Sequence, residues 1–139
     1  MATSEVTRPA PIVTDDSAAF WAAAADGRLV AQRCAACGRF RHPPRPMCPA
    51  CRSLVVEVVD LSGRGDVYSY AVLHHPPNPL FEYPVVIVLV DLEEGIRLLS
   101  NLTGVAPDAI EIGMPVEVHF APTADGMAVP QFRPVTVAS

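Results

Sequence analysis

The amino-acid sequence predicts a mainly β protein, with a short N-terminal helix, a zinc ribbon and a small C-terminal β-barrel. Two closely spaced cysteine pairs predict the ribbon, and apolar segments of strand length after residue 53 predict the barrel. Half of the 139 residues are hydrophobic and 18% are charged, so a buried core is feasible. We therefore expect three parts: an arm and helix at 1–27, the ribbon at 28–57 and the barrel at 58–139.

The N-terminal part predicts one short helix after a loose arm. Side chains at 14–16 can accept hydrogen bonds from the first N–H groups of a helix over 17–25. Gly27 then suits a left-handed C-terminal cap. The helix carries Phe20 and Trp21 among alanines. A helix this short is marginal alone, so the two rings either anchor it on the core or contact another chain.

The two cysteine pairs have the spacing of a zinc ribbon. Cys34 and Cys37 are followed, after ten residues, by Cys48 and Cys51, in the pattern C-x2-C-x10-C-x2-C. Each pair can turn both thiolates toward one ion, and two pairs complete a tetrahedral all-sulfur shell in which zinc is structural. Gly38 can take the positive φ that lets backbone N–H groups bond a thiolate. Iron in a rubredoxin-like shell and two separate redox motifs are the alternatives.

The segments after the second cysteine pair predict about five barrel strands with a helical insertion. Gly63 and Gly65 flank an expected bulge or tight bend, and 91–95 makes a hairpin turn. Residues 105–113 have room for one helical turn after the third strand, which fits an OB-type Greek-key barrel. An open sandwich is the alternative, because periodicity alone does not separate the two. The expected strands of the whole chain cover 29–32, 54–60, 64–75, 84–92, 96–104, 115–121 and 127–135.

Charge is distributed unevenly along the chain. Residues 28–52 hold six arginines and no acid, whereas 53–139 hold three arginines and eleven acids. A zinc ion with four thiolates carries a formal charge of −2, so 28–52 would stay near +4 when metallated. This segment is either a solvated basic face or a patch for an anionic partner surface, with Arg41 and Arg45 as candidate contacts.

No set of residues in the sequence assembles an active site. The chain has no lysine, which excludes Schiff-base and P-loop lysine chemistry, and the metal takes the cysteines. His74 and His75 are neighbours at a strand end, so they would point to opposite faces and would not form one clamp. We therefore expect no catalytic residue in this chain.

Two proline-rich segments, 76–83 and 130–134, are candidate contacts with a partner or ligand. A stiff apolar loop loses little entropy on ordering and suits docking or lining a channel. In the alternative, Phe81 and Phe132 seal the ends of the barrel. The candidate contact residues in and beside these segments are His74, His75, Pro76, Leu80, Phe81, Phe132 and Arg133.

The N-terminus has no basic start followed by an apolar stretch, so we expect no signal peptide and a cytoplasmic protein. No apolar run approaches the roughly 20 residues that span a bilayer, so we expect no membrane segment. In the cytoplasm, four cysteines favour a metal over disulfides.

The sequence contains LVAQRC at 29–34, HPPRPMCPAC at 42–51, SGRG at 62–65, GMPV at 113–116 and PQFRP at 130–134. These strings, within roughly 17–135, resemble the Zn-ribbon OB-fold family once called domain of unknown function 35. Arg52, the residue after the second cysteine pair, departs from that pattern, because many zinc ribbons carry glycine at this position. The resemblance implies an accessory partner of a thiolase-superfamily enzyme that helps form its acyl-CoA channel. A lipid-transfer-type aldolase of steroid side-chain degradation is the favoured partner.

Three functions remain open on the sequence alone. A non-catalytic subunit of an acyl-CoA enzyme complex explains the missing active site and the stiff apolar loops. A nucleic-acid-binding module is the second, since zinc ribbons and OB barrels serve there, but an acidic barrel opposes phosphate binding. A small CoA-thioester enzyme that uses His74 or His75 is the third.

Overall fold

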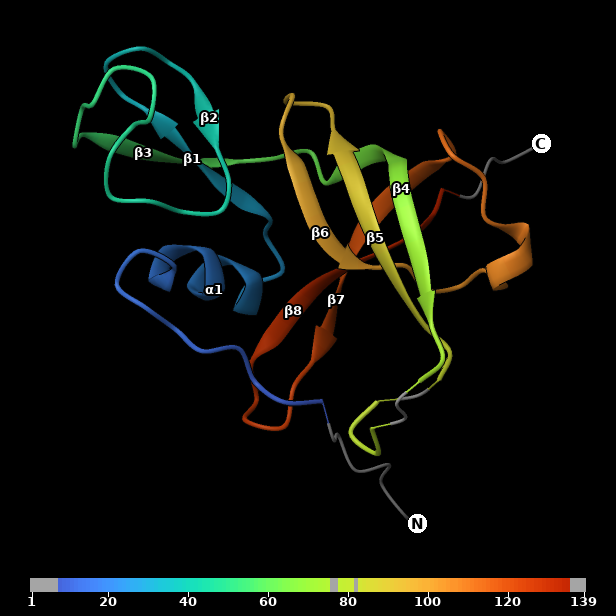
Figure 1. Ribbon diagram of the computed structural model, residues 1–139. Helices are drawn as coiled ribbons and strands as arrows, with labels where there is room; N and C mark the ends of the chain where they lie inside the picture. The colour runs from blue at the N-terminus through green and yellow to red at the C-terminus, as the bar shows by residue number, and fades with distance from the viewer. Residues whose placement is uncertain (1–7, 76–77, 82, 136–139) are drawn as a thin grey trace.

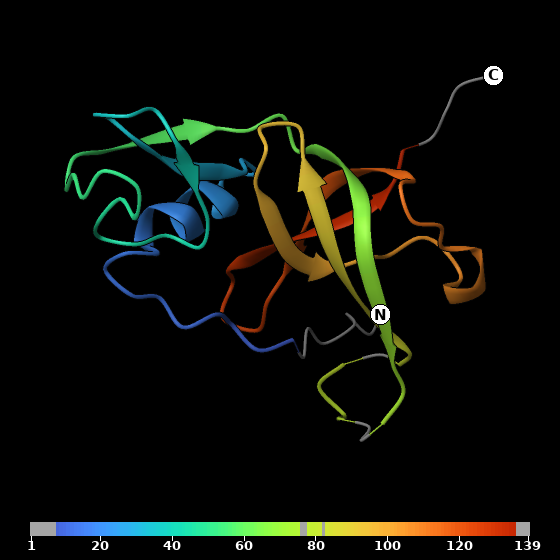
Figure 2. The ribbon, with the colours of Figure 1, turned by 45° about the horizontal axis from the view of Figure 1, so that its top comes forward.

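The computed structural model of the chain shows a small ribbon module beside a barrel (Figure 1). It describes residues 8–75, 78–81 and 83–135. These residues form a three-stranded sheet of order β2-β1-β3 and a five-stranded sheet of order β6-β5-β4-β7-β8. The two sheets stay side by side when the view is turned (Figure 2). The prediction of a mainly β fold with a short N-terminal helix, a ribbon and a barrel is confirmed.

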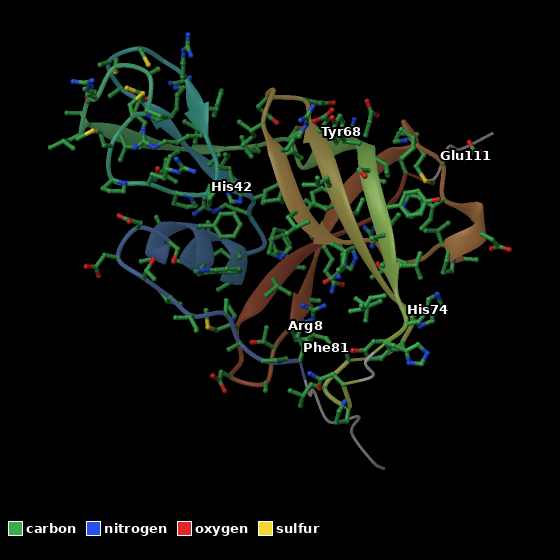
Figure 3. All side chains as sticks on the ribbon, viewed as in Figure 1. Arg8, His42, Tyr68, His74, Phe81 and Glu111 are labelled. Atoms are coloured by element: carbon green, nitrogen blue, oxygen red, sulfur yellow. The ribbon has the colours of Figure 1, made fainter. Side chains whose placement is uncertain are left out.

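The helix α1 spans Ala18–Ala25 and packs against strands β1 and β8, so it joins the ribbon to the barrel. Gly27 has a φ of 75°, the left-handed cap that the sequence predicts. Phe20 is 7% exposed, and its ring centre lies 5.2 Å from that of His42, beside α1 in Figure 3. Phe20 is therefore a core anchor, which corrects its place among the candidate partner contacts. No helix in the described part of the chain is long and apolar enough to cross a membrane.

The ribbon sheet consists of β1 (Val30–Cys34), β2 (Phe40–Arg41) and β3 (Val56–Asp60). β1 lies in the middle and pairs antiparallel with both neighbours. The sequence predicted β1 and β3 but not the two-residue β2. Because β3 pairs with β1 along its whole length, the ribbon sheet extends to Asp60, past the expected boundary at residue 57.

The barrel is built from five antiparallel strands that occur near the predicted positions. At its closing seam, Leu102 forms an isolated parallel bridge with Phe132, which brings the end of β6 against β8. A short 3-10 turn follows the third barrel strand, as expected for an OB barrel, and the near closure excludes an open sandwich. The elements are β4 (Arg64–Leu73), β5 (Val85–Leu92), β6 (Arg97–Asn101), η1 (Pro107–Ala109), β7 (Pro115–Pro122) and β8 (Ala128–Pro134).

The first barrel strand bends where the sequence predicts, but the bulge lies further along. Gly63 has a φ of 79°, and a Cβ on Gly65 would overlap the carbonyl oxygen of Asp91 on β5. The register between β4 and β5 shifts at Tyr68, between Val67 and Ser69. The two glycines thus serve the bend and a close backbone approach, and the bulge forms without a glycine.

The core lies inside the barrel and continues under α1. On β5 every second side chain is buried, which is the alternation expected of a strand with one face on a core. Phe132 on β8 has no exposed surface and is among the largest fully buried side chains. It therefore packs inside the barrel and cannot contact a partner, which corrects its place among the candidate contacts.

Candidate metal centre and contact surfaces

Four cysteine sulfurs meet in the ribbon. Cys34 ends β1, Cys37 lies in the turn to β2, and Cys48 and Cys51 lie in the loop before β3. All four Sγ atoms lie within 4.8 Å of one another. The Sγ of Cys34 is 3.4 Å from that of Cys51, and the Sγ of Cys37 is 3.7 Å from that of Cys48. Each short separation thus joins one knuckle to the other.

These separations fit one tetrahedral metal ion. Zinc–sulfur bonds of about 2.3 Å place the sulfurs of a tetrahedron about 3.8 Å apart, whereas a disulfide requires about 2.05 Å. The observed 3.4 Å and 3.7 Å match the tetrahedron, and all four cysteines are free. Four thiolate ligands complete the coordination shell of zinc or iron. No position then remains for water or substrate, so such a metal would stabilise the fold and would not act as a Lewis acid.

The two cysteine knuckles share one backbone conformation. Gly38 and Arg52 have φ values of 77° and 65°, and each donates its N–H to the carbonyl of the first cysteine of its pair at 2.9 Å. The predicted N–H to sulfur bond comes from Cys37, whose N–H lies 3.4 Å from the Sγ of Cys34. This backbone donor is the largest influence that lowers the pKa of Cys34, to about 6. The turn therefore favours the thiolate that a metal needs.

Arg41 lies inside the ribbon and not on its surface. It is 7% exposed, its Nε donates to Oε1 of Gln32 at 2.7 Å, and its Nη2 donates to the carbonyl of Arg45 at 2.9 Å. The same Gln32 oxygen accepts the N–H of Arg45 at 2.9 Å. Arg41 and Gln32 thus tie the loop between the knuckles to β1. This corrects the place of Arg41 among the candidate contacts, whereas the side chain of Arg45 is exposed.

The candidates after β4 lie at the end of the barrel away from Tyr68 and Glu111 (Figure 3). His74, His75 and Leu80 are exposed and Phe81 is half-buried, while Pro76 lies outside the described residues. Phe81 forms one wall of an open groove of about 580 Å³. A second hollow of about 660 Å³ shares Phe81, Tyr83 and Val85 with the first. The volumes are in the range of small-molecule sites.

Arg8 is the cation of this groove, and sequence reasoning missed it. Its guanidinium lies 5.3 Å from the centre of the Phe81 ring and donates from Nη2 to Oδ1 of Asn101 at 2.8 Å. Burial lowers the pKa of Arg8. The residue belongs to the arm that the sequence predicts to be loose, and no local pattern marks it. A mostly apolar groove with one arginine can take an apolar ligand that carries a carbonyl or anionic group.

The remaining candidates lie on separate surfaces. Trp21 is half-buried on α1, with its ring centre 4.9 Å from that of Phe20. Arg133 is exposed on β8 and forms an ion pair of 3.3 Å with Glu117 on β7. The structure therefore brings the four cysteines together, whereas the predicted contact residues that it describes lie on separate surfaces or in the core.

Comparison with known proteins matches both parts of the chain. The model of the ChsH2 rubredoxin-like zinc ribbon domain matches residues 21–57, and that of the ChsH2 C-terminal OB-fold domain matches residues 58–121. A probable enoyl-CoA hydratase alpha subunit of Thermomonospora curvata is 52% identical over 127 residues, or 91% of this chain and 40% of that protein. The chain thus spans less than half the length of that relative.

Two further proteins match over most of their own length. The benzoylsuccinyl-CoA thiolase subunit BbsA of Thauera aromatica is 33% identical over 106 residues, or 74% of this chain and 72% of that protein. A solved structure described as the Ltp2-ChsH2(DUF35) aldolase has 50% identity and a TM-score of 0.87, and covers 91% of this chain and 100% of that one. The two domain models and the solved structure match the ribbon and the barrel in order, so this chain belongs to the family of domain of unknown function 35, with a ChsH2-type zinc ribbon and OB-fold.

Proposed function

We propose that this chain is a non-catalytic subunit that binds a thiolase-superfamily acyl-CoA enzyme. The observation that carries the proposal is the match to the Ltp2-ChsH2(DUF35) aldolase, which extends over the whole of the matched chain with 50% identity. The name of BbsA, a benzoylsuccinyl-CoA thiolase subunit, supports the same class of partner. Within that class we propose an aldolase of steroid side-chain degradation.

The chemistry of the described residues supports a role in contact rather than catalysis. We propose that the four cysteines hold one zinc ion, which leaves no thiolate as a nucleophile and no open metal position. The chain has no lysine. His119 has its Nε2 2.8 Å from Oγ1 of Thr103, but Thr103 also lies 3.4 Å from the carbonyl of Phe132, so this pair joins strands.

We further propose that the groove around Arg8 forms part of the channel for the acyl-CoA substrate. Its walls are mostly apolar, and the guanidinium of Arg8, which Asn101 holds in place, is the charged group among its polar lining residues. Such a wall suits an acyl chain with a carbonyl or carboxylate. The match to a chain of the Ltp2-ChsH2(DUF35) aldolase supports the assignment, because it links a chain of this fold to an aldolase assembly.

Affinity purification of the tagged chain from its native source tests the proposal. We expect a thiolase-superfamily protein, identified by mass spectrometry, to be enriched over bare resin. A Cys34→Ser/Cys48→Ser variant serves as the control, because it removes one ligand from each knuckle and should recover less partner. Recovery of the intact chain without any thiolase-superfamily protein would overturn the proposal.

The charge of the barrel half argues against the nucleic-acid alternative. Residues 53–139 carry a formal charge of −8, from three arginines and eleven acids. Phosphate backbones bind to positively charged grooves, and neutralising them accounts for most non-specific affinity. A barrel of this charge would repel single-stranded nucleic acid.

A further inference from the structure

A strip of exposed aliphatic side chains runs through the start of β3 and the residues before it. Leu54 is 68% exposed, Val55 65%, Val56 37% and Val58 51%. Single exposed apolar residues are ordinary, but here Val56 and Val58 share one face of β3, and Leu54 and Val55 directly before the strand are exposed as well. We call residues 54–58 the β3 strip. Its only charged member, Glu57, is held by Arg33 of β1 at 2.7 Å.

The β3 strip is also a free strand edge. In the described part of the chain β3 pairs with β1 on one side only, and Figure 2 shows it along the outer border of the ribbon. Val55 accepts the N–H of Ala35, and Leu61 donates its N–H to Leu29. Since an antiparallel ladder alternates, the backbone groups of Val56 and Val58 point away from β1. An apolar edge with free backbone groups promotes pairing unless something covers it.

Charge shows what kind of surface would cover the strip. The acids of β3 are neutralised within the ribbon, Glu57 by Arg33 and Asp60 by Arg28, both at 2.7 Å. Residues 28–60 then hold six arginines against two acids, which leaves about +2 when a zinc tetrathiolate is added. Two copies of this chain docked ribbon to ribbon would bring like charges together, which disfavours self-association. A surface with acidic groups around an apolar centre would fit.

We propose that the β3 strip is a docking edge for the thiolase-superfamily subunit, which meets it with an apolar surface bordered by acidic side chains. This inference rests on the proposed function and names the surface that serves it. Val56 and Val58 supply both side chains and free backbone groups, so the partner backbone can pair with β3. The strip lies on the ribbon, whereas Arg8 of the groove lies at the end of the barrel away from Tyr68 (Figure 3).

Two substitutions in the strip and one matched control test the inference. Leu54→Ser removes a large exposed side chain, and Val58→Thr keeps the β-branched shape while adding a hydroxyl. Ile112→Ser is the control, because Ile112 is 64% exposed and follows Glu111, which lies on the side of the barrel away from the ribbon (Figure 3). All three positions are solvent-exposed in the free chain, so we expect little change in its thermal unfolding.

Binding is measured by calorimetric titration against the thiolase-superfamily protein recovered with the wild-type chain. We expect Leu54→Ser to weaken the dissociation constant about tenfold or more, and Val58→Thr by a smaller factor, with Ile112→Ser within about twofold of wild type. In the complex, hydrogen exchange at the amides of Val56 and Val58 should slow, because these amides would pair with the partner. Added salt should weaken binding of the wild type, since the ribbon is basic.

The outcomes separate this inference from the function on which it rests. If the partner binds Leu54→Ser and Val58→Thr as tightly as wild type, and the β3 amides exchange unchanged, the docking edge is wrong while the function stands. If the wild-type chain captures no thiolase-superfamily protein, the proposed function is wrong, and so is the assignment of the β3 strip to such a partner. Concentration-dependent dimers of the wild type that Leu54→Ser abolishes would assign the strip to a second copy and overturn the inference.

Discussion

Exchanging the residue types of the two knuckle turns tests whether Gly38 and Arg52 play the same backbone role. Both have positive φ, and each donates to the carbonyl of the first cysteine in its pair at 2.9 Å. A residue with a Cβ pays about 1–2 kcal/mol in this conformation. Ordering a glycine on folding costs about 0.4–1 kcal/mol more, because the unfolded chain has more conformational entropy at a glycine. The difference predicts that Arg52→Gly raises the free energy of unfolding by roughly 0.5–1 kcal/mol.

The reverse exchange should have the opposite sign. No atom lies within 4 Å of a Cβ built on Gly38, so Gly38→Ala meets no steric clash and carries only the conformational cost. We expect it to lower the free energy of unfolding by roughly 0.5–1 kcal/mol. Arg52→Ala is the control, since it removes the arginine side chain and keeps the Cβ; its effect should be near zero.

Urea unfolding of the metal-loaded proteins at one fixed zinc concentration provides the measurement. Fluorescence of Trp21, which is half-buried on α1, reports the transition, and linear extrapolation gives the free energy of unfolding. Competition with a chelator shows whether the zinc affinity changes in the same order. If Arg52→Gly were no more stable than Arg52→Ala, the left-handed turn at Arg52 would not carry the strain that we assign to it.

Three side chains in the interior or partly buried between strands give further tests. Phe132→Ala should cost about 3–5 kcal/mol in urea unfolding, because Phe132 has no exposed surface. Gln32→Ala should cost about 2–3 kcal/mol, because it removes the acceptor of the buried Arg41 guanidinium, and Gln32→Glu should restore stability; equal losses in both would contradict this. Burial, and to a smaller extent the charge of Arg133, lower the pKa of His119 in the folded chain. As pH falls through about 6.5, His119 is therefore protonated in the unfolded chain before it is protonated in the folded one, and this lowers the free energy of unfolding. Melting temperatures between pH 7.5 and 5 should therefore fall less in His119→Gln than in wild type.

The metal centre was predictable because its geometry is local. The C-x2-C pairs turn their own sulfurs toward one point, and ten intervening residues allow the second pair to reach the first. The barrel strands were predictable for a similar reason, since the alternation on β5 and the turn at 91–95 depend on residues that are consecutive in the sequence. The helical turn expected after the third barrel strand fitted an OB-type barrel, but only the seam between Leu102 and Phe132 excludes the open sandwich.

Properties that depend on distant residues were not predictable. Arg41 looks like a surface cation in a basic segment, and only the pairing of β2 with β1 places it beside Gln32. Phe132 lies in a string of prolines and polar residues, yet the bridge to Leu102 puts it at the barrel seam. Arg8 reaches Asn101 across 93 positions of sequence. Each placement results from tertiary pairing, which overrides the local pattern.

Native mass spectrometry of the assembly purified from the native source tests the central claim most directly, because one spectrum reports both metal and partner. We expect a hetero-oligomer in which each copy of this chain retains one zinc ion and is bound to a thiolase-superfamily subunit. A spectrum that shows this chain alone, or only associated with itself, would contradict the account.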